Sequence, residues 1–203
     1  MKAVLISIQP YWVFLIIARI MGWHIDKEKI IEVRKSFPKK QDWNKNVKIY
    51  CSKNKKSFSK ISKKYQPLME KFLGKVIGEF VCKGVMQPFD SLRLMAKQSC
   101  LTENELFEYS NGKTLYGWRI ADLVIYDKPK ELSEFYEPLK YDNIGGAKVV
   151  HCGHYLEEEA IDFCEFNNDF HNGDCSLKGC NELRKLYQIK RPPQSWCYVE
   201  ELE

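Results

Sequence analysis

An uncharged run near the N-terminus restricts most strongly what this chain can fold into. From Ala3 to Ala18 the sequence has no charged residue, and Pro10 divides the run into two parts. The β-branched residues before Pro10 predict a short, buried strand. Proline fits the first turn of a helix, where no amide donor is needed, so the apolar residues from Tyr11 to Met21 predict a buried helix that Gly22 ends.

The same run does not predict insertion into a membrane. It is shorter than the ~20 apolar residues that a membrane-spanning helix needs, and it lacks the small-residue cleavage site of a signal peptide. We therefore expect a soluble, cytoplasmic protein without membrane contact.

The rest of the chain mixes strand and helix signals. Alternating or β-branched residues predict strands, and the Thr102–Glu105 capping box predicts a helix that runs to about Tyr109. The Lys/Ser/Asn-rich segment 53–64 is expected to be a solvated loop. The fold class that follows is α+β, with the further strands at 29–34, 47–52, 74–82, 115–126 and 195–199 and a short helix at 66–73.

Charge is spread unevenly along the chain. The formal net charge is only +5, but the segment from Arg34 to Lys64 holds twelve basic residues and one acid, Asp42. Such asymmetry favours a polyanionic partner on one face. The residues that we expect to contact it are basic or aromatic: Lys39, Lys40, Trp43, Lys55, Lys56, Lys63, Lys64 and Trp118.

Three ionisable residues gather around the strand predicted at 29–34. Apolar and charged residues alternate there, so Glu32 and Arg34 should leave one face while Ile31 and Val33 face the core. A bend before the strand would bring Lys29 to the same place. Two interpretations compete: a recognition or catalytic site, or a solvated strand face.

The motif Lys29-x-x-Glu32-x-Arg34 resembles the ASCH domain, a family related to PUA domains that includes bacterial and prophage members. The stretches 7–12, 74–80, 116–120, 126–132 and 191–199 resemble the same family. One position departs from it, because the family has glycine two residues before the lysine and this chain has Lys27. The resemblance implies a PUA-like β-barrel with flanking helices over 1–135, completed by 195–203, with 136–194 as an insert.

That insert is rich in soft metal ligands. Five of the eight cysteines and three of the four histidines fall within 151–197. Because disulfides are rare in the cytoplasm, this clustering predicts a structural Zn²⁺ in tetrahedral coordination. The alternative is a set of free thiols in a poorly packed insert. The predicted ligands are Cys152, Cys164, Cys175 and Cys180, with His154 or His171 replacing one of them.

Three functions are compatible with these features. The first is binding of RNA, other single-stranded nucleic acid or a modified nucleoside: lysine and arginine would neutralise phosphates, Glu32 would accept from the amino edge of a base, and aromatic rings would stack. The second, implied by the ASCH resemblance alone, is an amidohydrolase acting on N4-acylated cytidine, in which Lys29, Glu32 and Arg34 would be catalytic. The third is a phage-type accessory protein that binds a host protein.

Zinc in the insert is directly testable. Protein purified without chelator should contain about one Zn²⁺ per chain, and a chelator should increase hydrogen exchange in 151–180 far more than in 1–135, because the metal would be the main source of order there. Metal analysis that finds no zinc, with every thiol free to react, would contradict this prediction.

Overall fold

The computed structural model describes residues 2–18, 20–38, 46–87, 91–144, 147–152, 163–164, 169–170 and 176–202, which form two compact units. The main unit consists of Ala3–Leu132 and Arg191–Cys197. The smaller unit consists of Met1–Lys2, Ser133–Lys190 and Tyr198–Glu203. The domain boundaries predicted from the sequence stay a prediction.

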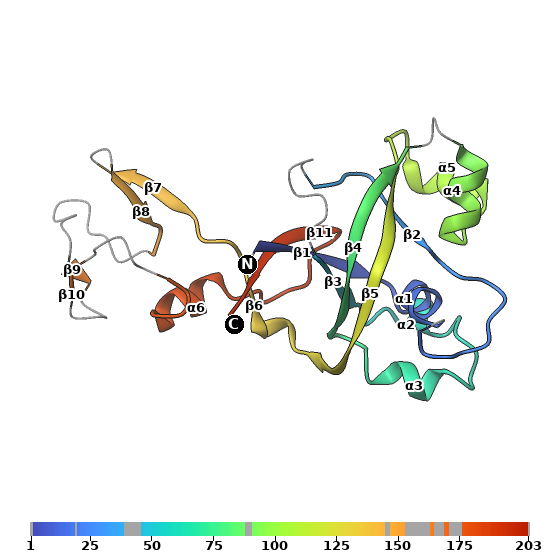
Figure 1. Ribbon diagram of the computed structural model, residues 1–203, viewed down its shortest axis with the longest axis horizontal. Helices are drawn as coiled ribbons and strands as arrows, with labels where there is room; N and C mark the ends of the chain where they lie inside the picture. Colours follow the sequence, from blue (N-terminus) through green and yellow to red (C-terminus); the bar gives the residue numbers. More distant parts are fainter. Residues whose placement is uncertain are drawn as a thin grey trace. The chain divides into compact units, whose positions relative to one another are not determined.

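The main unit is built from a sheet and short helices (Figure 1). Its strands are β1 (Lys2–Ile8), β2 (Ile31–Arg34), β3 (Asn46–Cys51), β4 (Val76–Met86), β5 (Tyr116–Lys130) and the start of β11 (Trp196–Glu201). Its helices are α1 (Pro10–Ile17), α2 (Lys55–Phe58), α3 (Gln66–Glu70), α4 (Leu92–Ser99) and α5 (Glu103–Ser110).

The strand order in this unit is β2-β5-β4-β3-β1-β11. Strand β1 is parallel to β3, whereas β3–β4, β4–β5 and β2–β5 are antiparallel. Figure 1 shows β4 and β5 as the two long neighbouring strands. The uncharged N-terminal run behaves as its sequence predicts: β1 is an inner strand, and α1 begins at Pro10, although it ends at Ile17 rather than at Met21.

The predicted α+β class is confirmed, but the described strands form an open sheet. With β6 (Phe135–Tyr136) the sheet has seven strands, and β2 and β6 stand at its two ends. A closed barrel requires hydrogen bonds between the first and last strands. These end strands have four and two residues, and each pairs with a single neighbour in this order.

Segment 53–64 is structured, contrary to the solvated loop expected from its composition. Asn54 caps α2 by accepting from the amide of Ser57, and the Ser57 hydroxyl accepts from the amide of Tyr11 at 3.1 Å. Ile61 is buried. The lysines of this segment are exposed, whereas Ser57 and Ile61 are buried and anchor it. Its polar composition therefore did not predict the two anchoring residues.

The smaller unit has its own apolar cluster, formed by Tyr136, Val150, Cys152, Leu177, Cys180, Leu183 and Tyr187. In it β6 pairs with the end of β11. Its other elements are the 3₁₀ helix η2 (Leu132–Glu134, which begins in the main unit), β7 (Tyr141–Ile144), β8 (Ala147–Val150), β9 (Phe163–Cys164), β10 (Asp169–Phe170) and α6 (Asn181–Tyr187).

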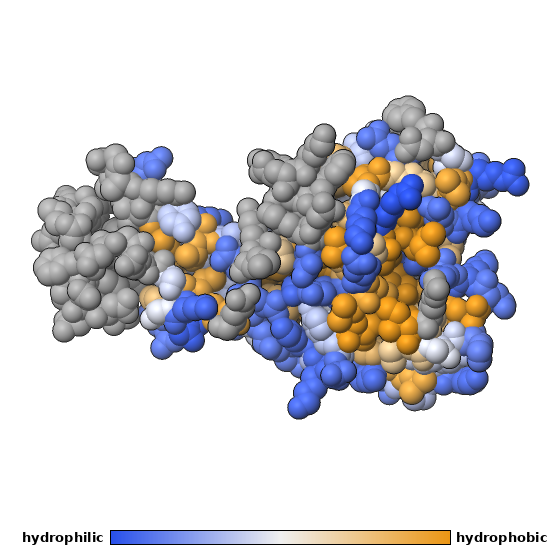
Figure 2. All heavy atoms as spheres, in the orientation of Figure 1, coloured by the Kyte–Doolittle hydropathy of each residue, from blue (hydrophilic) through white to orange (hydrophobic). Residues whose placement is uncertain are grey.

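The surface of the main unit is mixed. Figure 2 shows an apolar area on its visible face, bordered by hydrophilic residues. In the part of the chain that the structure describes, no helix combines the length and the apolar character needed to span a membrane.

Candidate functional site

Strand β2 carries the ionisable cluster that the sequence singles out. Its pairing with β5 sets Glu32 opposite Trp118 and Arg34 opposite Tyr116. Ile31 and Val33 are buried in an apolar cluster with residues of β4, α4 and α5. The period-two alternation is therefore confirmed, since the apolar side chains of β2 face the core and the charged ones leave the other face.

The charged face of β2 is nevertheless not solvated. Glu32 and Lys29 are each only 4% exposed. The Glu32 carboxylate lies between two cations, 3.0 Å from Arg34 Nη2 through Oε1 and 3.3 Å from Lys29 Nζ through Oε2. The interpretation as a solvated strand face is wrong, because both side chains are buried. Burial of a carboxylate is costly, and the two neighbouring cations offset that cost.

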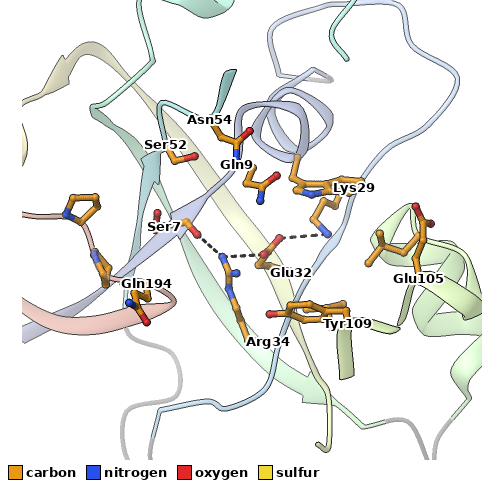
Figure 3. A pocket seen from close by; sticks show the side chains of 15 residues that line it. Ser7, Gln9, Lys29, Glu32, Arg34, Ser52, Asn54, Glu105, Tyr109 and Gln194 are labelled. Carbon is orange, nitrogen blue, oxygen red and sulfur yellow. Dashed lines mark hydrogen bonds and ion pairs between the residues drawn. The ribbon is translucent and has the colours of Figure 1, made fainter. Parts of the chain in front are cut away.

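Backbone carbonyls fix the two cations. Lys29 Nζ donates to the Ser99 carbonyl at 3.1 Å, and Arg34 Nη2 donates to the Ser7 carbonyl. Ser99 is the last residue of α4, where carbonyls lack an intrahelical donor, so the lysine supplies one. Figure 3 shows Arg34, Glu32 and Lys29 in a row, with dashed lines for the two ion pairs of Glu32 and for the hydrogen bond from Arg34 to Ser7.

The cluster still has polar atoms without hydrogen-bond partners. Among the described residues, the buried side-chain atoms of this kind include Glu32 Oε2, Arg34 Nε and Ser52 Oγ. The Lys29 ammonium attracts Oε2 electrostatically but makes no hydrogen bond to it. An unpaired buried polar group costs roughly 1–3 kcal/mol, and such a group commonly binds a water molecule or a ligand.

These three atoms belong to residues that line one cavity of about 540 Å³. The volume falls within the ~300–1,000 Å³ of typical small-molecule sites. The cavity is formed by β1, α1, β2, the segment after β3, α5 and the 192–194 segment. Its lining residues are Ser7, Gln9, Trp12, Lys29, Glu32, Val33, Arg34, Ser52, Asn54, Leu101, Glu105, Tyr109, Pro192, Pro193 and Gln194.

Aromatic and amide side chains complete the lining. Trp12 is partly exposed and lies against Lys29, with 5.3 Å between its ring centroid and Nζ. Tyr109 on α5 is 39% exposed. In the view of Figure 3, Gln9 and Tyr109 lie on opposite sides of the Lys29–Glu32 pair. The cavity thus offers two ring surfaces and side-chain amides that can both donate and accept.

A second carboxylate lies at the edge of this cavity. Hydrogen bonds from the Thr102 backbone amide and hydroxyl lower the pKa of Glu105 below its ordinary value. They form the capping box that the sequence predicts at the start of α5. Glu105 therefore remains ionised at neutral pH.

The predicted nucleic-acid contacts have different environments. Lys55, Lys56, Lys63 and Lys64 are exposed. Trp118 is 0% exposed, and its indole Nε1 donates to the Ser36 carbonyl, so its ring has no free face for a base. Lys39, Lys40 and Trp43 lie outside the described residues.

Most of the residues that line this cavity were not predicted as site residues from the sequence. Trp12 belongs to the stretch 7–12 that resembles the ASCH family, but as a side chain it was expected only in a buried helix, and Tyr109 only at the end of α5. Ser7 and Gln9 are polar residues in the otherwise apolar stretch before the helix-starting proline, and both line the cavity. Pro192, Pro193 and Gln194 belong to the stretch 191–199 that resembles the ASCH family, but their place beside β2, far away in sequence, was not predicted.

The predicted zinc ligands are described only in part. Cys152 and Cys180 lie in the apolar cluster of the smaller unit, and Cys180 Sγ accepts from the Leu183 amide at 3.5 Å. Cys164 belongs to β9, but its side chain lies outside the described part, as do Cys175, His154 and His171. Within the described part no group of three His, Cys, Asp or Glu side chains is arranged to hold a metal. Zinc stays a prediction.

Comparison with known proteins gives structural matches only. No protein-family model and no curated protein matches the chain. It is similar to the crystal structure of ASCH from Zymomonas mobilis, with 17% identity and a TM-score of 0.43 over 64% of this chain and 73% of that one. A mutant form of that protein matches with 15% identity and a TM-score of 0.44 over 79% and 94% of the two chains.

Coupling within the cluster can be measured by a double-mutant cycle. Glu32→Gln keeps the shape of the side chain but removes the charge that compensates Lys29 and Arg34, so it should lower the free energy of unfolding by about 1–3 kcal/mol. Lys29→Met removes one cation at similar length. In the double variant, the decrease in the free energy of unfolding should be about 1 kcal/mol smaller than the sum of the two single decreases, as measured by urea denaturation.

Glu103→Gln is the matched control, because Glu103 is exposed on α5, does not line this cavity and does not belong to the ion cluster. It should cost at most about 0.5 kcal/mol. Strict additivity of Glu32→Gln and Lys29→Met would show that the two charges are not coupled in the folded protein.

Proposed function

We propose that the cavity at Lys29, Glu32 and Arg34 binds a nucleobase, carried by single-stranded nucleic acid or by a modified nucleoside. The observation that carries the proposal is Glu32 Oε2, a buried carboxylate oxygen at a cavity wall that accepts no hydrogen bond. Such an oxygen can accept a hydrogen bond from an exocyclic amino group or a ring N–H group of a base.

The other free atoms fit the same kind of ligand. Arg34 Nε is an unpaired donor, and bases present acceptors beside their donors. Ser52 Oγ, Gln9 and Asn54 can adapt to either kind of group. A base has two apolar faces as well as a polar edge, and Trp12 and Tyr109 offer rings on which it can stack, a contact worth roughly 1–3 kcal/mol per base.

An amidohydrolase acting on N4-acylated cytidine is the second candidate, favoured by the same carboxylate oxygen. Glu32 Oε2 would accept a proton from a water molecule that attacks the acyl carbon. The amide C–N bond would then break, the amine would take up that proton, and cytidine and a carboxylic acid would result. Lys29 already donates to a backbone carbonyl, so it would act as a donor to the developing oxyanion and not as the base.

Further parts of the sequence-based prediction belong to this proposal. The exposed Lys55, Lys56, Lys63 and Lys64 would attract the phosphates of a longer strand. The zinc-bound insert and a host-protein partner stay predictions, whereas the described strands form an open sheet and not the closed barrel that the resemblance implied.

The proposal can be tested by isothermal titration with cytidine, N4-acetylcytidine, uridine, adenosine and guanosine, together with single-stranded RNA at low salt. Glu32→Gln should weaken binding of the preferred ligand about tenfold or more, because it replaces a charged acceptor. Glu103→Gln should bind like the unmodified protein. Tyr109→Ser, on an exposed helix face, should weaken binding without threatening the fold.

Chromatography of the N4-acetylcytidine mixture separates the two candidates. Release of cytidine and acetate that is lost in Glu32→Gln would establish the hydrolase. Binding without turnover would establish the recognition function. If no nucleoside and no RNA binds, or if a folded Glu32→Gln variant binds as well as the unmodified protein, the proposal is wrong.

A further inference from the structure

A second cavity adjoins the first one in the main unit. It has a volume of about 690 Å³ and shares Trp12, Leu101 and Glu105 with the first cavity. The two cavities therefore lie next to each other and share part of their lining. The remaining lining residues are Tyr11, Asp26, Lys27, Glu28, Lys60, Ala96, Lys97, Cys100 and Thr102.

Three lysines from separate parts of the chain converge on this second cavity. Lys27 precedes β2, Lys60 follows α2, and Lys97 lies in the last turn of α4. Among the described residues, none of their ammonium groups takes part in an ion pair or hydrogen bond. Their charges are thus available to a ligand.

The carboxylates of Asp26, Glu28 and Glu105 line the same cavity, so its ionisable side chains carry no net charge. Glu105 is occupied by its capping box with Thr102, and Glu28 has another interaction. Lys60 and Lys27 lie close enough to Glu105 to contribute to its lowered pKa. In the described part none of the three ammonium groups makes an ion pair or a hydrogen bond, so each of them can still donate to a phosphate oxygen.

Lys27 also connects the two cavities electrostatically. Cys100 lines the second cavity, and both Lys27 and Lys29 act on its thiol, although burial dominates and raises the pKa of Cys100. Lys29 belongs to the first cavity. Lys27 and Lys29, one from each cavity, thus both lie near Cys100 at the end of α4, as does the carboxylate of Glu28.

We infer that the second cavity binds the phosphodiester and sugar next to the base held in the first cavity, so that a segment of at least two nucleotides binds more tightly than a free nucleoside. This inference rests on the proposed function. Lysine ammonium groups are common phosphate binders, and Asp26 can accept from a sugar hydroxyl, as acidic residues do in other nucleotide sites. Trp12, which lines both cavities, would separate the base from the phosphate.

The test compares each ribonucleoside with the dinucleoside monophosphate of the same base, by isothermal titration at low salt. For the base that binds best, the dinucleoside monophosphate should bind about tenfold or more tightly than the nucleoside, as charge-assisted contacts to phosphate predict. The triple variant Lys27→Gln, Lys60→Gln and Lys97→Gln should lose this advantage and leave the affinity for the nucleoside unchanged.

The matched control is a triple variant at Lys83, Lys113 and Lys128, each changed to Gln, because these lysines are exposed and line neither cavity. It should keep the full advantage of the dinucleotide. Equal affinity for nucleoside and dinucleotide in the unmodified protein would overturn the inference but leave the proposed function standing. Equal losses of the dinucleotide's advantage in the two triple variants would also overturn the inference, because they would indicate only a general effect of charge. If neither ligand binds, the proposed function itself fails.

Discussion

The arrangement of the main unit around its cavity depends on the burial of Glu32 between Lys29 and Arg34. An ionised carboxylate that is 4% exposed is destabilising unless opposite charges and hydrogen bonds surround it. Here the two cations are themselves held by carbonyls of Ser99 and Ser7. The ion cluster therefore connects β2 to the end of α4 and to β1, elements that come from distant parts of the chain.

The end of α4 shows how local structure serves this cluster. Cys100 has a left-handed backbone with a φ of 60°, and the Leu101 amide donates back to the Ala96 carbonyl at 3.1 Å. This is a common way to end a helix. It leaves the Ser99 carbonyl available to Lys29 and directs the chain toward the capping box of α5. The same turn places Cys100 and Leu101 in the walls of the two cavities.

Local patterns in the sequence predicted much of the fold and one part of the site. The alternation in β2, the proline at the start of α1, the capping box of α5 and the return of the C-terminal strand were all visible, because each depends on neighbouring residues. The burial of Glu32 was not visible, since it depends on what α1, α5 and the 192–194 segment place over β2. Trp118 shows the same limit: an aromatic residue suits a ligand surface or a core equally well, and here it is core. In segment 53–64, the lysines hid the contributions of Ser57 and Ile61.

The central claim is that the unsatisfied atoms of the ion cluster receive a base. Arginine Nε–H groups give their own signals in two-dimensional proton–nitrogen NMR spectra, and Arg34→Lys identifies the signal of Arg34. During titration with cytidine, uridine, adenosine and guanosine in turn, the Arg34 signal should shift and saturate with at least one nucleoside, because its free N–H gains an acceptor. The signal of Arg93, exposed on α4 and outside the cavity, should stay in place. An Arg34 signal that does not move with any of the four nucleosides would contradict the account.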